Sequence, residues 1–350
     1  MDKVFFLAMC RSLFRKGKVV RQIAFAIALL SWNLHYDRNH YCYAEDDIDR
    51  SSPRSTRNET RRPNIPMQTF GGLQLWTDYA YQNGYRIQCN ALTKHWRLLD
   101  ARDVRHAWGT RQQCETALKN IFDGSAPKAS PDHCVVLIHG LMRTRNSMQP
   151  LEEVLANLCG SEIILFSYAS SRDSIGQHAE ALREFLESLP PKQTISFVGH
   201  SMGNIVVRHL IADLMKDEKG KALLSRFKKM VMLGPPNQGA AIARRFASLG
   251  LLEVVAGRGA MELGPEWGTL MQNLAVPPFP FMIIAGELGE KSIQNPLLKN
   301  ESDFVVEVDE AKLDGSDVFK TVPVLHSFLM QDAAVQKMVA EYVCEPENKK

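Results

Sequence analysis

From residue 131 onwards, short apolar segments of strand length alternate with longer segments that have helical periodicity. Helical spacing is clearest in residues 203–215, where Val206, Leu210 and Leu214 recur at every fourth position. Continuous apolar strands separated by amphipathic helices predict an α/β fold, with a mostly parallel sheet and helices on both faces. The predicted strands are "CVVLIHG" (134–140), "EIILFSYA" (162–169), "TISFVGH" (194–200), "KKMVMLG" (228–234), "FPFMIIAG" (279–286) and "VFKTVPVLH" (318–326).

Residues 71–125 have a different pattern and predict a small β-hairpin and helix module. "YRIQCN" and "HWRLLD" alternate loosely around a short polar connection, as the strands of a hairpin do, and "RQQCETALKNIF" has helical periodicity. Trp76, Tyr85 and Trp96 form either a binding surface or part of a core, and strand spacing favours the core. The sequence assigns no chemistry to this module.

The first 44 residues combine a basic stretch with the short apolar segment "IAFAIALLSW" at 23–32. That segment is short for a membrane span, and the small residue Ala44 follows it, so the pattern favours a secretory signal cleaved after Ala44. An N-terminal membrane anchor and a non-functional extension are the alternatives. Residues 45–70 are mostly charged or polar and predict a linker. We therefore expect an exported or membrane-associated protein, with its main α/β domain at 131–345.

Composition excludes several classes of function. The chain has 350 residues, 45% of them hydrophobic, and a net charge of +3, with much of the basic excess near the N-terminus. This near-neutral balance argues against a nucleic-acid-binding protein. The sequence contains no glycine-rich phosphate loop, HExxH motif or paired CxxC motif, so we expect neither a cofactor nor a metal ion.

Removal of residues 1–44 would leave an odd number of cysteines, so the remaining ones cannot all pair within one chain. Cys134 and Cys159 lie in apolar periodic runs and are interpreted as buried thiols. Cys89 and Cys114 lie in one polar module and could be bridged in an oxidising compartment. The remaining cysteine is Cys344.

The segment "TISFVGHSMGNIVV" places Ser201 between an apolar strand and a helix, with Gly199 and Gly203 on either side. A sharp strand-to-helix turn exposes such a serine, and small neighbours allow the strand and helix to approach each other. The N-terminus of the following helix also presents unpaired N–H groups to developing negative charge. Ser201 is therefore a candidate nucleophile, and a purely structural turn is the alternative.

From residue 131 to 345 the chain resembles the α/β-hydrolase superfamily and, within it, the bacterial lipases and esterases. The resemblance lies in "LIHGL" at 137–141, "GHSMG" at 199–203, "GPPNQG" at 234–239, and "SDFVV" at 302–306 followed by "VLHS". It implies the α/β-hydrolase fold and a nucleophile, acid and base that occur in the order Ser, Asp, His along the chain.

The resemblance also implies an oxyanion hole built from backbone N–H groups. Leu141, after His139 and Gly140, and Met202, after the nucleophile, are the expected donors. Because main-chain groups donate, neither side chain needs special chemistry. His139 is expected to position its loop and His200 to pack beside the nucleophile, without acting in catalysis.

His326 is the expected general base, because it follows the last strand and precedes the terminal helix, where the superfamily places this residue. His178 and His209 are the rivals. Both lie in helical segments and come too early in the chain.

Asp303 is the expected acid, which would hold His326 in the correct tautomer. "SDFVVEV" resembles the "DGVVP" stretch of the family, with Phe304 where glycine is usual and Glu307 where proline is common. These departures imply a loop of different shape. The local competitors are Asp309, Asp314 and Asp317.

These residues predict a serine carboxylesterase or lipase that acts on an ester or lipid through an acyl-enzyme. Transient contact with a membrane or lipid surface is a further expectation. Residues 240–276 are interpreted either as a lid or acyl pocket or as a packing helix with its connection. Alternatives to ester hydrolysis are acyl transfer, thioester or amide hydrolysis with the same triad, and a non-catalytic module that binds lipid or protein.

Overall fold

The computed structural model describes residues 67–68, 74–123, 130–247, 257–289, 298 and 301–344. All of these residues belong to the unit Ile65–Lys350. The expected signal or anchor at 1–44 lies outside the described residues, as does the predicted linker except for residues 67–68. No helix in the described part of the chain combines the length and apolar character needed to cross a bilayer.

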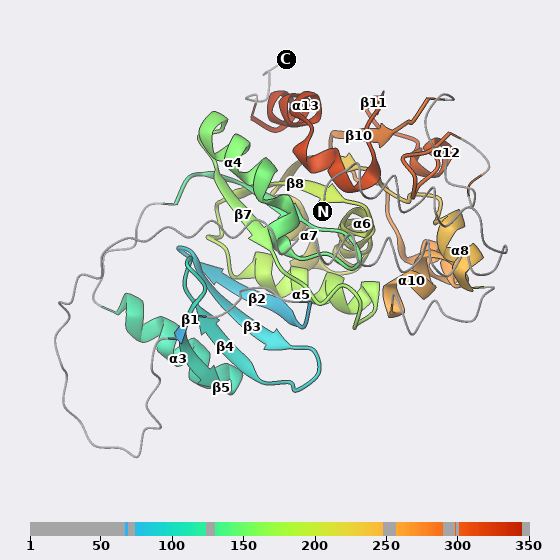
Figure 1. Cartoon of the computed structure of the whole chain (residues 1–350). Coiled ribbons are helices and arrows are strands. Elements are labelled where there is room, and N and C mark those ends of the chain that lie inside the picture. The colour runs from blue at the N-terminus through green and yellow to red at the C-terminus, as the bar shows by residue number, and fades with distance from the viewer. Residues whose placement is uncertain are drawn as a thin grey trace. The chain divides into compact units, whose positions relative to one another are not determined.

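The larger sheet has six strands, all parallel, in the order β11-β10-β9-β8-β6-β7 (Figure 1). Its four inner strands are buried along most of their length, which explains why they consist of continuous apolar runs. The parallel sheet predicted from the sequence is therefore confirmed. The strands are β6 (His133–Ile138), β7 (Glu162–Phe166), β8 (Thr194–His200), β9 (Phe227–Leu233), β10 (Phe281–Gly286) and β11 (Val318–Val322).

Helices cover both faces of this sheet, as predicted. Alternate residues of β6 serve the two faces: Val135 and Leu137 belong to one apolar cluster, and Val136 and Ile138 to the other. The first cluster includes residues of α4 (Gln149–Leu158) and α13 (Ala333–Cys344). The second includes residues of α5 (Ile175–Glu187), α6 (Met202–Leu214) and α7 (Glu218–Leu224).

Residues 67–122 form a second, antiparallel sheet of five strands in the order β1-β5-β4-β3-β2, with one helix. Strands β3 and β4 pair as the hairpin that the alternation predicts. On one face, Cys114 and Leu118 of the helix pack with Ile87, Leu98 and Ala107. The elements are β1 (Met67–Gln68), β2 (Trp76–Gln82), β3 (Tyr85–Asn90), β4 (Trp96–Leu99), β5 (Val104–Gly109) and α3 (Arg111–Phe122).

Aromatic side chains of the small sheet serve mainly packing. Tyr85 and Trp96 pack against the apolar cluster under α3. Trp76 instead packs edge-to-face with Trp108, at a distance of 6.4 Å between ring centroids. The guanidinium carbon of Arg97 lies 3.9 Å from the centroid of the Trp76 ring. These contacts are consistent with the core interpretation for Tyr85 and Trp96.

Short helices lie in the connections that follow β6, β9, β10 and β11. Of the predicted lid or pocket segment 240–276, residues 248–256 lie outside the described part. The short helices are α8 (Ala241–Ala247), α10 (Arg258–Leu263), α11 (Trp267–Leu270) and α12 (Val308–Ala311), with the 3-10 helices η1 (Arg145–Met148), η2 (Met271–Asn273) and η3 (His326–Gln331).

A disulfide joins Cys159, at the end of α4, to Cys344, the last residue of α13. The interpretation of Cys159 as a buried thiol is therefore wrong, because the two helices pack side by side and bring the Cα atoms to 5.1 Å. Cys89 and Cys114 are both free thiols, so the bridge considered between them is absent from the described chain. Cys134 is a buried thiol, as predicted.

Candidate active site

Ser201 occupies a strained turn between β8 and α6. Its backbone has φ 52° and ψ −124°, a conformation that residues with a Cβ atom rarely adopt. The turn is fixed by its own hydrogen bonds: Ser201 N donates to Leu233 O at 2.8 Å, and the Asn204 side chain donates to Ser201 O at 3.0 Å. Strain held in this way is typical of a nucleophile elbow.

Gly203 is required because α6 begins against the end of β6. A Cβ atom at Gly203 would lie 2.6 Å from Ile138 O and 2.7 Å from His139 O. Only glycine therefore lets the helix N-terminus approach the loop that follows β6. This approach brings the first turn of α6 close to the loop containing Leu141.

His326 and Asp303 form a buried pair. The Nδ1 atom of His326 lies 2.6 Å from Oδ2 of Asp303, and His326 N donates to Asp303 O at 2.9 Å. The other carboxylate oxygen accepts from Val305 N and Val306 N at 3.0 and 2.8 Å. A carboxylate that accepts from Nδ1–H leaves Nε2 of the ring able to accept a proton, which is the arrangement a general base requires.

Contacts around two glycines show that the predicted site residues converge. A Cβ at Gly140 would lie 2.9 Å from Ser201 Cβ and from His200 Nδ1. A Cβ at Gly234 would lie 2.8 Å from His326 Nδ1 and 3.1 Å from Asp303 Oδ2. His200 links the two groups, since its Nε2 donates to His326 O at 3.0 Å. The carboxyl ends of β6, β8, β9 and β10 therefore meet at one site.

The competing acids have other partners or lie at the surface. Asp309 pairs with Lys312 at 2.7 Å, and its side chain is 70% exposed. Asp317 accepts from Tyr342 Oη at 2.8 Å, and Asp314 is exposed. Asp303 is the one of the four that contacts His326 in the structure.

The competing histidines also have other surroundings. His209 pairs with Asp213 on the same helix at 2.9 Å. His178 is buried edge-on to Tyr168, and burial lowers its pKa to about 3. A histidine that stays neutral throughout the physiological range cannot exchange protons as a base with a pKa near neutrality does.

His139 fixes the loop after β6. Its Nδ1 donates to Gly140 O at 2.9 Å, and its ring stacks on Tyr168 at a centroid distance of 4.3 Å. Burial lowers the pKa of His139 to about 4, so the ring is neutral. Burial and the neighbouring His326 likewise hold the pKa of His200 well below its usual value. Both histidines occupy structural positions around Ser201.

The predicted oxyanion donors flank the nucleophile. Met202 is the first residue of α6, where backbone N–H groups have no partner within the helix. Leu141 follows Gly140, which approaches Ser201. Main-chain donors from two different loops are the arrangement that would stabilise negative charge on a carbonyl oxygen.

Tyr168 was missed by the sequence analysis. Its hydroxyl donates to His139 O at 2.6 Å, and its position is buried. Desolvation raises the pKa of this hydroxyl, which therefore remains a donor. A tyrosine two residues after the end of β7, in "ILFSYA", is the signal that could have indicated a buried polar role at this edge.

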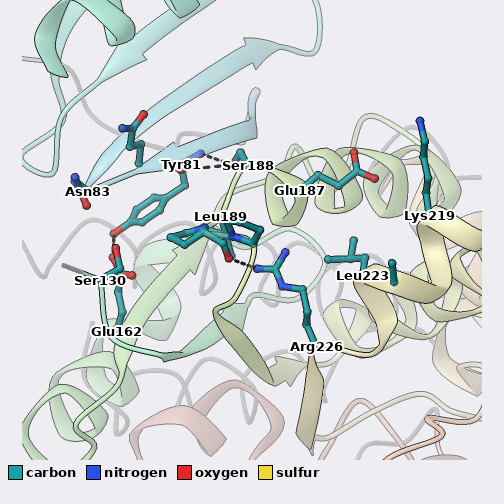
Figure 2. Close-up of a pocket in the computed structure, with 14 residues that line it drawn as sticks. Tyr81, Asn83, Ser130, Glu162, Glu187, Ser188, Leu189, Lys219, Leu223 and Arg226 are labelled. Carbon is teal, nitrogen blue, oxygen red and sulfur yellow. Dashed lines mark hydrogen bonds between the residues drawn. The ribbon is translucent and has the colours of Figure 1, made fainter. Parts of the chain in front are cut away.

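A cavity of about 800 Å³ lies at the other edge of the sheet (Figure 2). Its lining includes Ser130, Glu162 and Arg226, which precede or begin strands, whereas Ser201 follows one. Figure 2 shows Tyr81 pointing toward Glu162, and their oxygens are 2.9 Å apart. Arg226 donates to Pro190 O at 2.9 Å. This cavity is separate from the Ser201 site, because its lining does not include Ser201, Asp303 or His326.

Within the described ranges, no group of three or more His, Cys, Asp or Glu side chains is arranged to hold a metal ion. The titratable groups that converge near Ser201 are His200, His326 and Asp303. This set suits proton transfer between a serine and a histidine.

Residues 128–235 match the family described as "Putative serine esterase (DUF676)", and this segment includes Leu141, Ser201 and Met202. None of the curated proteins compared with the chain matches it.

Several solved structures are similar to this chain at low sequence identity. The mature form of the Bacillus licheniformis lipase BlEst2 is 15% identical with a TM-score of 0.50, over 63% of this chain and 94% of the lipase. Its propeptide form is 13% identical with a TM-score of 0.51, over 64% of this chain and 53% of the other. The lin2722 gene product from Listeria innocua is 15% identical with a TM-score of 0.45, over 64% of this chain and 97% of the other. The chain therefore has the α/β-hydrolase fold, and residues 128–235 are similar to the family of putative serine esterases.

Proposed function

We propose that the protein hydrolyses carboxylic esters through an acyl-enzyme on Ser201. The single observation that carries this proposal is the buried His326–Asp303 pair beside a serine whose φ is 52°. A structural turn would need neither an oriented imidazole nor a strained serine.

In the proposed mechanism, Ser201 Oγ attacks the ester carbonyl while His326 Nε2 takes the hydroxyl proton. Asp303 holds the imidazole in the required tautomer and stabilises its protonated form. The N–H groups of Leu141 and Met202 stabilise the oxyanion. His326 then protonates the departing alcohol, and a water molecule cleaves the acyl-enzyme to release the carboxylic acid.

Residues of the 240–276 segment support an acyl pocket as part of this proposal. Gly259 in α10 lies against Met202, because a Cβ at Gly259 would be 2.6 Å from the Met202 sulfur. Glu262 of the same helix accepts from Ile175 N at 2.7 Å, which holds α10 beside the start of α5. An apolar acyl chain on Ser201 would meet this segment first, so an ester or lipid is the proposed substrate class.

We also propose that the protein is exported or membrane-associated through its N-terminal segment, as the pattern of residues 1–44 favours. The Cys159–Cys344 disulfide supports this proposal, because disulfides persist mainly outside the reducing cytosol.

The test is fluorophosphonate labelling of the full chain together with hydrolysis of a panel of p-nitrophenyl esters. We expect labelling and turnover in the wild type and in Ser225→Ala, which removes an exposed hydroxyl. Ser201→Ala and His326→Ala are expected to lose both, with kcat reduced by about 10⁴ to 10⁶. A Ser201→Ala protein that keeps wild-type turnover would refute the assignment.

A further inference from the structure

The loop that carries Leu141 is held by the small antiparallel sheet, which lies outside the segment similar to serine esterases. Gln74, just before β2, donates from Nε2 to Met142 O at 2.6 Å. Met142 has φ 58°, a left-handed conformation that costs roughly 1 kcal/mol or more for a residue with a Cβ atom. The Gln74 hydrogen bond therefore falls on the strained residue next to the proposed oxyanion donor.

A second attachment fixes the other end of this loop. Arg145 Nη2 donates to both carboxylate oxygens of Asp103 at 2.8 Å, and Asp103 lies in the turn between β4 and β5. The side chains are 13% and 22% exposed. An ion pair largely withdrawn from water holds its geometry more rigidly than a surface pair, because solvent screens it less.

The Asp103–Arg145 pair belongs to a row of alternating charges across the sheet. Arg86 also pairs with Asp103, and Arg86 Nη1 lies 3.9 Å from Asp78 Oδ1. Asp78 is fully buried, and its other oxygen accepts from Ser167 N at 2.7 Å. The row of charges thus runs from Arg145, in the segment after β6, to Asp78. Asp78 in turn binds Ser167, which directly follows β7.

At the Asp78 end of the row, β2 supports the opposite side of the loop that carries Leu141. Thr77 Oγ1 accepts from Ala169 N at 3.1 Å, so β2 holds the residues on both sides of Tyr168. Tyr168 in turn stacks on His139 and donates to its carbonyl. Residues 139–145 are therefore fixed from two sides by one sheet.

Buried ion pairs often add little net stability compared with apolar packing, and their best-attested use is to fix register and orientation. An oxyanion hole needs that property, because its donors must lie at about 2.7–3.1 Å from the developing charge. We propose that Gln74 and Asp103 are positioning residues that fix the Leu141 N–H of the oxyanion hole from the small sheet. This inference rests on the proposed esterase function of Ser201.

The kinetic test compares Gln74→Met with Gln82→Met in the full chain. Both substitutions remove an amide of similar size, but Gln82 is exposed at the far end of β2. Gln74→Met is expected to lower kcat on a p-nitrophenyl ester about tenfold, with KM and melting temperature close to wild type, because a displaced donor loses part of the 10²–10³-fold effect of a lost one. Gln82→Met is expected to match the wild type.

Asp103→Asn is expected to act in the same direction, and Asp103→Glu, which keeps the charge for Arg145, to retain more of kcat than Asp103→Asn. If Asp103→Asn fails to fold, Gln74→Met still decides the question, because replacing an uncharged side chain leaves the buried ion pairs intact. Wild-type kcat in Gln74→Met, with Ser201→Ala inactive, would overturn the positioning role and leave the proposed function intact.

Hydrogen–deuterium exchange of a peptide spanning 139–148 tests the same role without any substrate. We expect about tenfold faster exchange of this peptide in Gln74→Met than in Gln82→Met, because an unanchored loop opens more often. Unchanged exchange would overturn the positioning role. Absence of ester hydrolysis and labelling in the wild type would instead overturn the proposed function, and the exchange result would still decide whether Gln74 holds the loop.

Discussion

The Nε2–H of His200 donates to the backbone carbonyl of His326 at 3.0 Å, so the residue before the proposed nucleophile holds the residue proposed as base. Their rings are also 4.6 Å apart between centroids. Because burial keeps His200 neutral, this single donor has a fixed direction. The spacing between Ser201 and His326 therefore depends on a neighbour that takes no part in proton transfer.

His200→Phe is expected to lower kcat about tenfold while KM changes little. The phenyl ring removes the His200 donor to His326 O and allows the base to shift, and one lost hydrogen bond is worth about 1 kcal/mol. His209→Gln, which changes a partly buried histidine paired with Asp213, is the matched control. Steady-state kinetics on one ester checks the prediction, and equal losses in the two variants would contradict it.

Asp303→Asn is expected to lower kcat by about 10⁴ with the fold intact, because the amide no longer enforces the required tautomer of His326. Asp309→Asn, which changes an exposed acid a few residues further on, is expected to leave kcat unchanged. Fluorophosphonate labelling rates report the same difference without an ester substrate. A larger effect at Asp309 than at Asp303 would move the acid to the other residue.

Acid is expected to destabilise the fold as the pH falls from about 6.5 toward 4. His139 and His178 have pKa values lowered to about 4 and about 3 in the folded chain, against an ordinary value of 6.5. The unfolded chain therefore binds more protons in this range, and the free energy of unfolding falls with pH by on the order of 3 kcal/mol for His139. Above pH 6.5 this contribution is complete.

Urea denaturation between pH 7.5 and 4.5 measures this dependence. His139→Gln is expected to flatten the curve, because an amide cannot take up the proton. His95→Gln, at an exposed position, is expected to leave the curve as in the wild type. Parallel curves for wild type and His139→Gln would contradict the prediction.

Loss of the Cys159–Cys344 disulfide is expected to lower the free energy of unfolding by about 2–5 kcal/mol, because it closes a loop with a sequence separation of 185. Melting temperature with and without dithiothreitol checks this in the wild type. The double variant Cys159→Ala, Cys344→Ala is expected to melt lower and to show no response to reductant. A wild type that is insensitive to reductant would argue against the bridge.

Phe304→Gly is expected to be about 1 kcal/mol more stable than Phe304→Ala. Phe304 has φ 85°, and both substitutions remove the same buried ring, but only glycine relieves the left-handed backbone. Chemical denaturation of the two variants measures the difference. Equal stabilities would show that the loop relaxes out of this conformation without the ring.

The four inner strands of the parallel sheet were predictable because burial on both faces requires continuous apolar runs. Strands β2 and β5 were not predicted, since "WTDYAYQ" and "VRHAWG" carry polar groups at buried or half-buried positions. Asp78 is the clearest case: its burial is possible only because Ser167, Gln88 and Arg86 surround it, and these residues are distant in sequence.

The candidate site was predictable where chemistry and sequence order coincide. Ser201 follows a strand and precedes a helix, and His326 follows the last strand, so local pattern places both at one edge. The partner of Cys159 was not predictable, because Cα separation depends on how α4 and α13 pack. The left-handed Phe304 shows that the unusual loop keeps the backbone shape for which glycine is usual.

The Cys159–Cys344 bond makes the chain between these residues a covalent ring, and Ser201, Asp303 and His326 all lie within it. Leu141 and the small sheet lie in the linear segment that precedes the ring. A single peptide cleavage inside the ring would therefore leave nucleophile, acid and base in one molecule. A cleavage between Leu141 and Cys159 would instead cut the covalent link between the Leu141 donor and the ring that carries the Met202 donor, the nucleophile, the acid and the base.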